Sequence, residues 1–350
     1  MRNQNIKVAI WGFGAMGSGM AKMILKKQGF EIVGVCDRNP NYVHKNMYDV
    51  LRINQSNHKI VTIQPNIEEV VQEASCDVVL VATDSFTAKT YPKLKWLLEH
   101  KVNVISTAEE MAFPYANEPA LAKELDEIAK ANGVTILGTG INPGMMMDLL
   151  VVCLSGVMET VESVDVKRIN SLSPFGHTVM EEQGVGVSIA EFEAGMKNHT
   201  IAGHIGFKES IHMISKALGW KIDEVNQQMA PIATNVDRKA LFGFAKANDV
   251  AGVDMRAQGV VDGVVKISMH HPQQIEPQLA GVDTGDYITI EGNPPVHMAI
   301  KPEIDGGIGT IAICVNMIPH VMNAKSGLKT MLDLPVPRAI MGDVRQMIEQ

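Results

Sequence analysis

Residues 12–17 read Gly12-Phe13-Gly14-Ala15-Met16-Gly17, a G-x-G-x-x-G pattern between an apolar run and a segment of helical character. In such a loop the first glycine permits a tight turn, the second lets the backbone approach a pyrophosphate, and the third lets helix and strand pack closely. The helix N-terminus attracts phosphate through its unpaired N–H groups. The pattern predicts a dinucleotide-binding loop; the other interpretation is a glycine-rich turn with a packing role alone.

An acidic residue stands where this type of loop needs one. A second strand runs from Phe30 to Cys36, and Asp37 follows it, about 20 residues after the last glycine. A carboxylate at this point accepts hydrogen bonds from a ribose diol, which favours NAD. The guanidinium of Arg38 could stack on adenine or pair with a 2′-phosphate, or it could be a solvated loop residue. We therefore expect NAD or NADP.

The first part of the chain alternates short β-branched runs with helical segments. Near-continuous apolar strands separated by helices indicate a parallel sheet covered on both faces, which predicts an α/β, Rossmann doubly wound domain. The expected strands are 6–11, 30–36, 59–63, 77–82, 102–106 and 134–137, and the expected helices are 15–28, 67–74, 88–100 and 119–132. In open α/β sheets ligands bind beyond the carboxyl ends of the strands, so Ala82, Thr83 and Thr107 are expected to contact the cofactor.

The pattern changes after Gly138. We expect an apolar helix from Pro143 to about Gly156, and further helices over 188–196 and 207–218. Alternation with period two over 159–170, 260–269 and 287–291 predicts strands with one solvated face, and His270-His271-Pro272 is expected to close a strand as a turn. The second domain is therefore predicted to be α+β, with a mixed or antiparallel sheet. The boundaries we expect are 1–142 for the first domain, completed by the apolar segment 306–350, and 143–305 for the second.

Composition narrows the class of protein. Charged residues make up 20% and hydrophobic residues 46%, which excludes a disordered chain. The net charge of −8 argues against a nucleic-acid surface. We expect no membrane span and no secretory signal, and hence a cytoplasmic protein. The four cysteines, Cys36, Cys76, Cys153 and Cys314, are scattered, so we expect buried free thiols and no metal site.

Several segments together resemble a known family. They are GFGAMG with Asp37, the turn VATDS, the segment NVISTAEEMAFP, and GTGINPGMMMD over residues 138–148. The chain is similar to the NAD(P)-dependent amino-acid dehydrogenases related to dihydrodipicolinate reductase and homoserine dehydrogenase. Within that group it most resembles the 2,4-diaminopentanoate dehydrogenases, including the segments SPFGHTVMEEQGVG and GLKTMLDLP. The SGHHRxK segment of dihydrodipicolinate reductases is not found, since Pro272 follows the two histidines, nor is the lysine pair expected in homoserine dehydrogenases.

The resemblance implies a homodimer whose second domain binds an amino-acid substrate. It also implies oxidative deamination of 2,4-diaminopentanoate to 2-amino-4-oxopentanoate, a step of ornithine degradation. Such a reaction needs a group for the substrate carboxylate, for which Arg168 is our first candidate. Asn142 could cap a helix, touch substrate or contact the cofactor. Proton transfer needs a carboxylate or imidazole, and the candidates are Glu109, Glu110, Glu181, Glu182 and His177.

Each of these side chains could instead be structural or solvated. Asp148 could be a buried hydrogen-bonded residue or part of the site. Two other functions stay open on the same sequence: a reductase like dihydrodipicolinate reductase or homoserine dehydrogenase, and a non-catalytic dinucleotide sensor. Fold does not decide among them, because function depends on the site.

Overall fold

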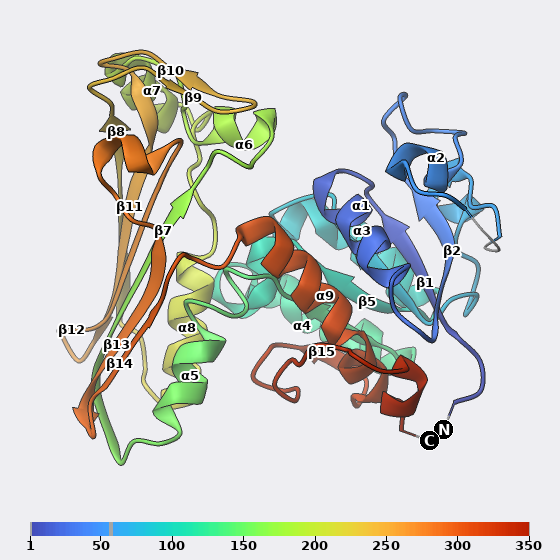
Figure 1. Ribbon diagram of the computed structural model, residues 1–350. Coiled ribbons are helices and arrows are strands. Elements are labelled where there is room, and N and C mark those ends of the chain that lie inside the picture. Colours follow the sequence, from blue (N-terminus) through green and yellow to red (C-terminus); the bar gives the residue numbers. More distant parts are fainter. Residues whose placement is uncertain (1, 56–58, 350) are drawn as a thin grey trace. The chain divides into compact units, whose positions relative to one another are not determined.

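A parallel sheet carries the glycine-rich loop (Figure 1), and among the described residues it has seven strands. The structure, a computed structural model, describes residues 2–55 and 59–349. The strand order is β15-β6-β5-β4-β1-β2-β3. The strands are β1 (Ile6–Trp11), β2 (Phe30–Cys36), β3 (Ile63–Gln64), β4 (Val78–Val81), β5 (Asn103–Ser106), β6 (Thr135–Gly138) and β15 (Gly327–Lys329).

Helices cover both faces of this sheet. On one face α3 (Thr87–Glu99) and α4 (Pro119–Ala131) contact each other, and their buried leucine and alanine side chains pack on β4, β5 and β6. Successive strand residues point to opposite faces, and the second layer is formed by α1 (Ala15–Ile24) and α9 (Gly306–Asn323), which also contact each other. The predicted Rossmann fold class is confirmed. Short elements complete this part: α2 (Met47–Leu51), η1 (Ile67–Glu69), η2 (Glu109–Ala112), η3 (Pro114–Ala116) and η5 (Val344–Met347).

The chain divides into two compact units. Unit 1 comprises Met1–Met145 and Gly306–Gln350, and unit 2 comprises Met146–Asp305. The C-terminal part of unit 1 supplies α9 and also β15, which pairs with β6 in parallel. A short strand this close to the C-terminus was not predicted from the sequence.

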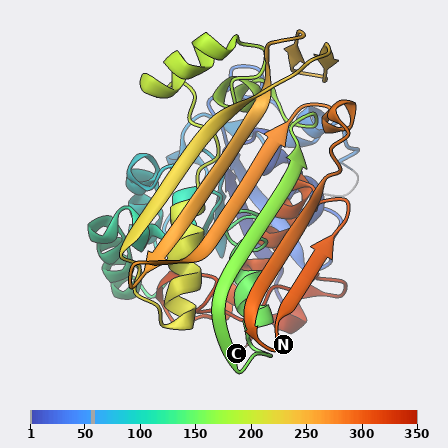
Figure 2. The same ribbon diagram turned by 90° about the vertical axis from the view of Figure 1, so that its left-hand side faces the viewer.

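Unit 2 is built on a mixed sheet of six strands in the order β14-β13-β7-β12-β11-β8. β7 and β12 run parallel, and the other neighbouring pairs are antiparallel. Two helices, α5 (Leu149–Ser155) and α8 (Phe207–Leu218), pack their apolar side chains on one face, and Figure 2 looks onto the other face. The strands are β7 (Thr160–Ser171), β8 (Glu224–Ala233), β11 (Val250–Val261), β12 (Val264–Gln274), β13 (Gly285–Asn293) and β14 (Val296–Ile300). The predicted α+β class of this domain is confirmed.

A smaller group of elements lies at one end of this sheet (Figure 1). Its core contains Leu172, Met180, Ala245, Ala251 and Ile275. The elements are α6 (His177–Glu182), α7 (Ile189–Lys197), β9 (Arg238–Lys239), β10 (Phe244–Ala245) and η4 (Pro277–Ala280). Glu181 and Glu182 therefore belong to the short helix α6.

The predicted helix from Pro143 is wrong at its start. α5 begins only at Leu149, after Asp148. One carboxylate oxygen of Asp148 accepts a hydrogen bond from the Leu149 N–H at 2.7 Å, and the other accepts one from the Ser210 hydroxyl at 2.8 Å. Asp148 is thus a buried N-cap that also joins α5 to α8. The apolar residues before it could not reveal this start, because hydrophobicity continues across it.

The predicted strand over 260–269 is two strands joined by a tight turn. Asp262 and Gly263 have φ values of +51° and +74°, which a two-residue hairpin turn of type I′ requires. β11 and β12 then pair as neighbours. His270-His271-Pro272 lies inside β12, so the prediction of a turn there is also wrong.

Three smaller predictions fail as well. The strand expected over 59–63 is reduced to β3, and the helix expected over 67–74 is the single turn η1. Cys153 is exposed, whereas the other cysteines are buried as predicted.

Within the ranges that the structure describes, no helix combines the length and the apolar character needed to cross a bilayer.

Gly17 holds α1 against β1, and the loop offers a matched pair of variants to test this. A Cβ atom on Gly17 would lie 1.8 Å from the Gly12 carbonyl oxygen, whereas a Cβ on Gly14 would meet nothing within 4 Å. Gly17→Ala should lower the free energy of unfolding by about 1–3 kcal/mol or more through overpacking. Gly14→Ala should leave it near the wild-type value. Urea unfolding of both proteins measures the difference, and equal stabilities would contradict this packing role.

Candidate active site

The N-terminus of α1 faces open space at the carboxyl edge of the unit 1 sheet. Gly14 is the N-cap and offers no side chain to the first N–H groups of the helix. Gly12 has a φ of +94°, and its N–H donates to the Cys36 carbonyl at 2.8 Å. A Cβ on Gly12 would lie 2.4 Å from the Ala82 carbonyl oxygen. A hydrogen bond and close packing therefore hold the loop against the ends of β2 and β4, while Gly14 faces open space.

Asp37 closes the loop from the end of β2. One oxygen of its carboxylate accepts a hydrogen bond from the Phe13 N–H, and the other accepts one from the Asn39 N–H at 2.7 Å. Each carboxylate oxygen has a second lone pair for a further donor. The side chain is half-buried, and that of Arg38 beside it is exposed. Asp37 is thus fixed in place and still able to accept hydrogen bonds from a ribose diol.

Other predicted cofactor contacts lie along the same edge. The Ala82 N–H donates to the Trp11 carbonyl at 2.8 Å, and the Thr107 N–H donates to the Val81 carbonyl at 3.0 Å. The ends of β1, β4 and β5 thereby lie side by side. Thr83 and Thr107 are half-buried, as is Asn142, which follows β6.

A lysine that the sequence analysis missed joins this edge. The Lys93 ammonium, on α3, donates to the Thr83 hydroxyl at 2.8 Å and to the Asp84 carboxylate at 2.5 Å. Burial raises the pKa of Asp84, but hydrogen bonds from Lys93 and Thr83 outweigh burial and leave the pKa below its usual value. Lys93 therefore fixes the turn at Thr83. The sequence alone does not reveal this role, because it does not show which residues the side chains of α3 contact.

Thr139, just after β6, is a second residue that the sequence analysis missed. It is buried, and its hydroxyl oxygen has no hydrogen-bond partner within the described part of the chain. The next residues contact the start of α9, where the Thr310 hydroxyl accepts a hydrogen bond from the Ile141 N–H at 3.1 Å. The edge thus ends in a polar group whose hydrogen-bonding capacity is unused.

The two glutamates after β5 differ in their surroundings. The Glu110 carboxylate accepts a hydrogen bond from the Thr87 N–H at 2.7 Å, so it caps the N-terminus of α3 and has a structural role. Glu109 is half-buried and opens η2 at the same edge.

In unit 2, Arg168, the predicted anchor of a substrate carboxylate, is bound by other groups of the protein. Its side chain is 2% exposed, and its guanidinium pairs with the Asp286 carboxylate. It also donates to the Ile304 carbonyl at 2.6 Å, and the Ile304 N–H donates to Asp286 at 2.9 Å. The charge of Arg168 is therefore already compensated inside the protein. Alternation along β7 showed a strand but not which carboxylate would pair with its arginine.

Two histidines lie beside this ion pair. The Nδ1 atom of His271 is 2.8 Å from the Arg168 carbonyl, and the rings of His271 and His204 meet edge to face with centroids 4.8 Å apart. Burial, and then the charge of Arg168, lowers the pKa of His204 to about 4. Burial also lowers the pKa of His271, with His204 and Arg168 adding to the effect. Both rings are therefore neutral near pH 7.

The other predicted catalytic residues of unit 2 are exposed. His177 and Glu181 lie on α6, and the ring of His177 meets that of Phe242 edge to face with centroids 5.1 Å apart. Neither belongs to the group around Arg168. In the described residues there is no group of three or more His, Cys, Asp or Glu side chains that could hold a metal ion.

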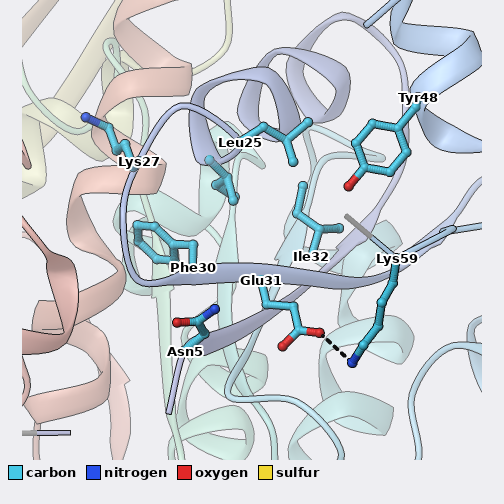
Figure 3. A pocket seen from close by; sticks show the side chains of 9 residues that line it. Asn5, Leu25, Lys27, Phe30, Glu31, Ile32, Tyr48 and Lys59 are labelled. Carbon is cyan, nitrogen blue, oxygen red and sulfur yellow. Dashed lines mark hydrogen bonds and ion pairs between the residues drawn. The ribbon is translucent and has the colours of Figure 1, made fainter. Parts of the chain in front are cut away.

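A cavity of about 340 Å³ opens at the other edge of the unit 1 sheet (Figure 3). Phe30 and Glu31 begin β2 there, so the cavity lies at the amino ends of the strands. Ligands of open α/β sheets bind at the carboxyl ends, and we therefore do not assign this cavity to the cofactor. It is lined by Asn5, Ile24, Leu25, Lys27, Phe30, Glu31, Ile32, Tyr48 and Lys59.

Comparison with known proteins identifies the family. The family described as "2,4-diaminopentanoate dehydrogenase C-terminal domain" matches residues 145–350, and the one described as "Dihydrodipicolinate reductase, N-terminus" matches residues 6–112. The 2,4-diaminopentanoate dehydrogenase of Acetoanaerobium sticklandii is 56% identical over 348 residues, which is 99% of this chain and 98% of that protein. The chain belongs to the 2,4-diaminopentanoate dehydrogenase family.

Two more distant relatives are named amine dehydrogenases. An amine dehydrogenase of Streptomyces virginiae is 23% identical, with 96% of this chain and 98% of that protein covered. The solved structure of the amine dehydrogenase of Mycobacterium smegmatis is 25% identical, with a TM-score of 0.85 over 96% of this chain and 98% of that one. The resemblance noted in the sequence is thus confirmed, and the chain is a dehydrogenase.

The residues present fit the NAD(P) of this family. An uncapped helix N-terminus and the open space in front of Gly14 suit a pyrophosphate, which a Cβ at this position would approach. Asp37 retains lone pairs for a ribose. Gly12, Phe13, Gly14, Ala15, Met16 and Gly17 would hold the phosphates, and Ala82, Thr83 and Thr107 follow along the same edge.

Asp37 and Arg38 offer opposite tests of cofactor recognition. Asp37→Ala should lower kcat/KM for NAD about 10-fold or more, since one charge-assisted hydrogen bond contributes roughly 1.5–3 kcal/mol. The loss with NADP should be smaller, because the carboxylate repels a 2′-phosphate. Arg38→Ala should weaken NADP alone. Steady-state kinetics with both cofactors measure kcat/KM for each. An unchanged ratio of the NAD value to the NADP value in Asp37→Ala would contradict the contact between Asp37 and the ribose.

The Arg168–Asp286 pair predicts a stability effect. Arg168→Leu leaves a buried carboxylate without its cation and should cost about 3–5 kcal/mol of unfolding free energy. Arg168→Leu combined with Asp286→Leu should recover most of this loss, because no charge is then left unpaired. Thermal and urea unfolding of both variants check the prediction. A stable Arg168→Leu protein with a raised KM for substrate would restore the role as carboxylate anchor.

His204 predicts a pH dependence of stability. Its pKa is about 4 in the folded protein and about 6.5 in an unfolded chain, so between these values the unfolded chain binds the extra proton. Stability should therefore fall as pH falls from 6.5 to 4. His204→Phe should reduce this slope, and His297→Phe, at an exposed position, should not. Urea unfolding of the wild-type, His204→Phe and His297→Phe proteins at pH 7 and pH 5 measures the loss of stability. An equal loss in all three proteins would contradict the assignment of the pH dependence to His204.

Proposed function

We propose that this chain oxidatively deaminates 2,4-diaminopentanoate to 2-amino-4-oxopentanoate with NAD or NADP. The observation that carries the proposal is the identity of 56% to a protein of that name, which extends through both units. The amine dehydrogenases among the relatives support oxidation of a C–N bond. We infer a place in ornithine degradation from the same resemblance.

The reaction balances with one water molecule. The substrate loses the hydrogen of C4 as hydride and its C4 amine becomes an imine; water adds at C4, and ammonia leaves. When bound, NAD(P)⁺ accepts the hydride. The protein must hold the substrate, accept a proton from the C4 ammonium and admit the water. We propose Glu109 for the proton, because it lies on the edge that carries the glycine-rich loop; His177 and Glu181 are the alternative proton acceptors.

The cofactor would be held by the residues of the carboxyl edge. The proposed contacts are Gly12, Phe13, Gly14, Ala15, Met16, Gly17, Asp37, Arg38, Ala82, Thr83, Thr107 and Asn142. We propose residues 1–142 with 306–350 as the dinucleotide-binding domain and 143–305 as the domain for substrate and dimerisation. We further propose a homodimer in the cytoplasm; light scattering would give its mass, and a monomer would overturn the dimer.

Formation of NAD(P)H and ammonia tests the function. With 2,4-diaminopentanoate we expect the two products in equal amounts. Glu109→Gln should lower kcat about 100-fold or more, in the range for loss of a general base, and Glu118→Gln, outside the edge, should not. Turnover of homoserine or of a dihydrodipicolinate-type substrate in place of 2,4-diaminopentanoate would overturn the proposal. Cofactor binding without turnover of any of these substrates would favour a sensor.

A further inference from the structure

The inner face of the unit 2 sheet, which α5 and α8 cover, changes from apolar to polar at one level. Directly paired residues of neighbouring strands point to the same face. On β7 the inner side chains run from Val164 and Val166 to Arg168 and Asn170. The two neighbours of β7 change at the same level: Ile267 and Met269 give way to His271 and Gln273 on β12, and Ile290 and Ile288 give way to Asp286 on β13.

Two amides at this polar end have unused hydrogen-bonding capacity. Asn170 and Gln273 are paired in register on parallel strands, and each side chain is 5% exposed. The Oδ1 atom of Asn170 and the Nε2 atom of Gln273 have no hydrogen-bond partner in the described part of the chain. One is an acceptor and the other a donor. Buried polar atoms are almost always paired, so unpaired atoms on two residues that lie in register on neighbouring strands point to an occupant.

The four titratable groups of the ion pair and the two histidines, Arg168, Asp286, His204 and His271, carry no uncompensated charge. Arg168 is paired with Asp286, and the rings of His271 and His204 are neutral because burial lowers the pKa of each. The backbone N–H of His204 lies 2.9 Å from the sulfur of Met255, and Met255 pairs with His271. The loop before α8 therefore lies over this end of the sheet. An occupant with no net charge, carrying both donors and acceptors, matches such a site.

We propose that Asn170 and Gln273 bind the amino-acid head of the substrate, with Asn170 accepting from the C2 ammonium and Gln273 donating to the carboxylate. A zwitterion has no net charge, and its two ends need one acceptor and one donor. This inference rests on the proposed function, and it leaves the C4 amine at the free end of the substrate. It also moves carboxylate recognition from Arg168, whose partner is Asp286, to a neighbouring amide.

Norvaline, which is 2-aminopentanoate, is the probe for the head alone. It keeps the carboxylate and the C2 ammonium but lacks the C4 amine, so calorimetric binding to the enzyme loaded with NAD reports on the head without turnover. The wild-type protein should bind norvaline. Gln273→Met and Asn170→Leu should weaken this binding about 10- to 100-fold, the effect of losing a hydrogen bond to a charged group. Gln258→Met on the exposed face of β11 is the matched control and should bind normally.

Each result has one meaning. The inference is overturned if folded Gln273→Met binds norvaline as tightly as the wild-type protein does. It is also overturned if the wild-type protein does not bind norvaline, because in either case the amides do not bind the amino-acid head. If Gln273→Met does not fold, Gln273→Glu keeps the shape and should weaken norvaline through repulsion of its carboxylate. Pentan-2-amine has the reacting amine but lacks the amino-acid head. If the Gln273→Met or Asn170→Leu protein binds pentan-2-amine more weakly than the wild-type protein does, the amides contact the C4 amine, and the inference is overturned. Turnover of 2,4-diaminopentanoate by the wild-type protein tests the proposed function separately.

Discussion

The close contact between Gly17 and the Gly12 carbonyl is the constraint on which the dinucleotide site depends. It brings the first turn of α1 directly behind the end of β1, since no side chain separates the two backbones. The N–H groups at the start of α1 then face the open space at Gly14. Asp37 completes the arrangement by accepting from the Phe13 N–H, so the carboxylate that we propose for the ribose also holds the loop that we propose for the phosphates.

Unit 2 shows a second constraint, the cost of burying polar groups. Arg168 and Asp286 compensate each other, and His271 and His204 stay neutral. These groups form a polar layer at one end of a sheet whose remainder is packed with apolar side chains. Asn170 and Gln273 are the members of this layer with unpaired atoms, which is why recognition of the substrate is assigned to amides and not to charged groups.

The sequence predicted those features that depend on local chemistry. The glycine-rich loop, Asp37 and the helix over 207–218 are each specified by residues close together in the chain, and the structure has all three. Features set by distant residues were missed or wrong. The partner of Arg168 lies on another strand, the start of α5 depends on Asp148 bonding to Ser210, and β15 joins the sheet from near the C-terminus. The turn at Asp262-Gly263 was a local signal that could have been read, because Asp-Gly between apolar runs is typical of hairpins.

A crystal structure of the enzyme with NAD and norvaline would show where the cofactor and the amino-acid head bind. We expect the pyrophosphate against the N–H groups that follow Gly14, a ribose hydroxyl on Asp37, and the norvaline ammonium and carboxylate on Asn170 and Gln273. Norvaline bound to the Arg168 guanidinium, with Asp286 displaced, would contradict the assignment in unit 2. A dinucleotide bound away from the Gly12–Gly17 loop would contradict the assignment in unit 1.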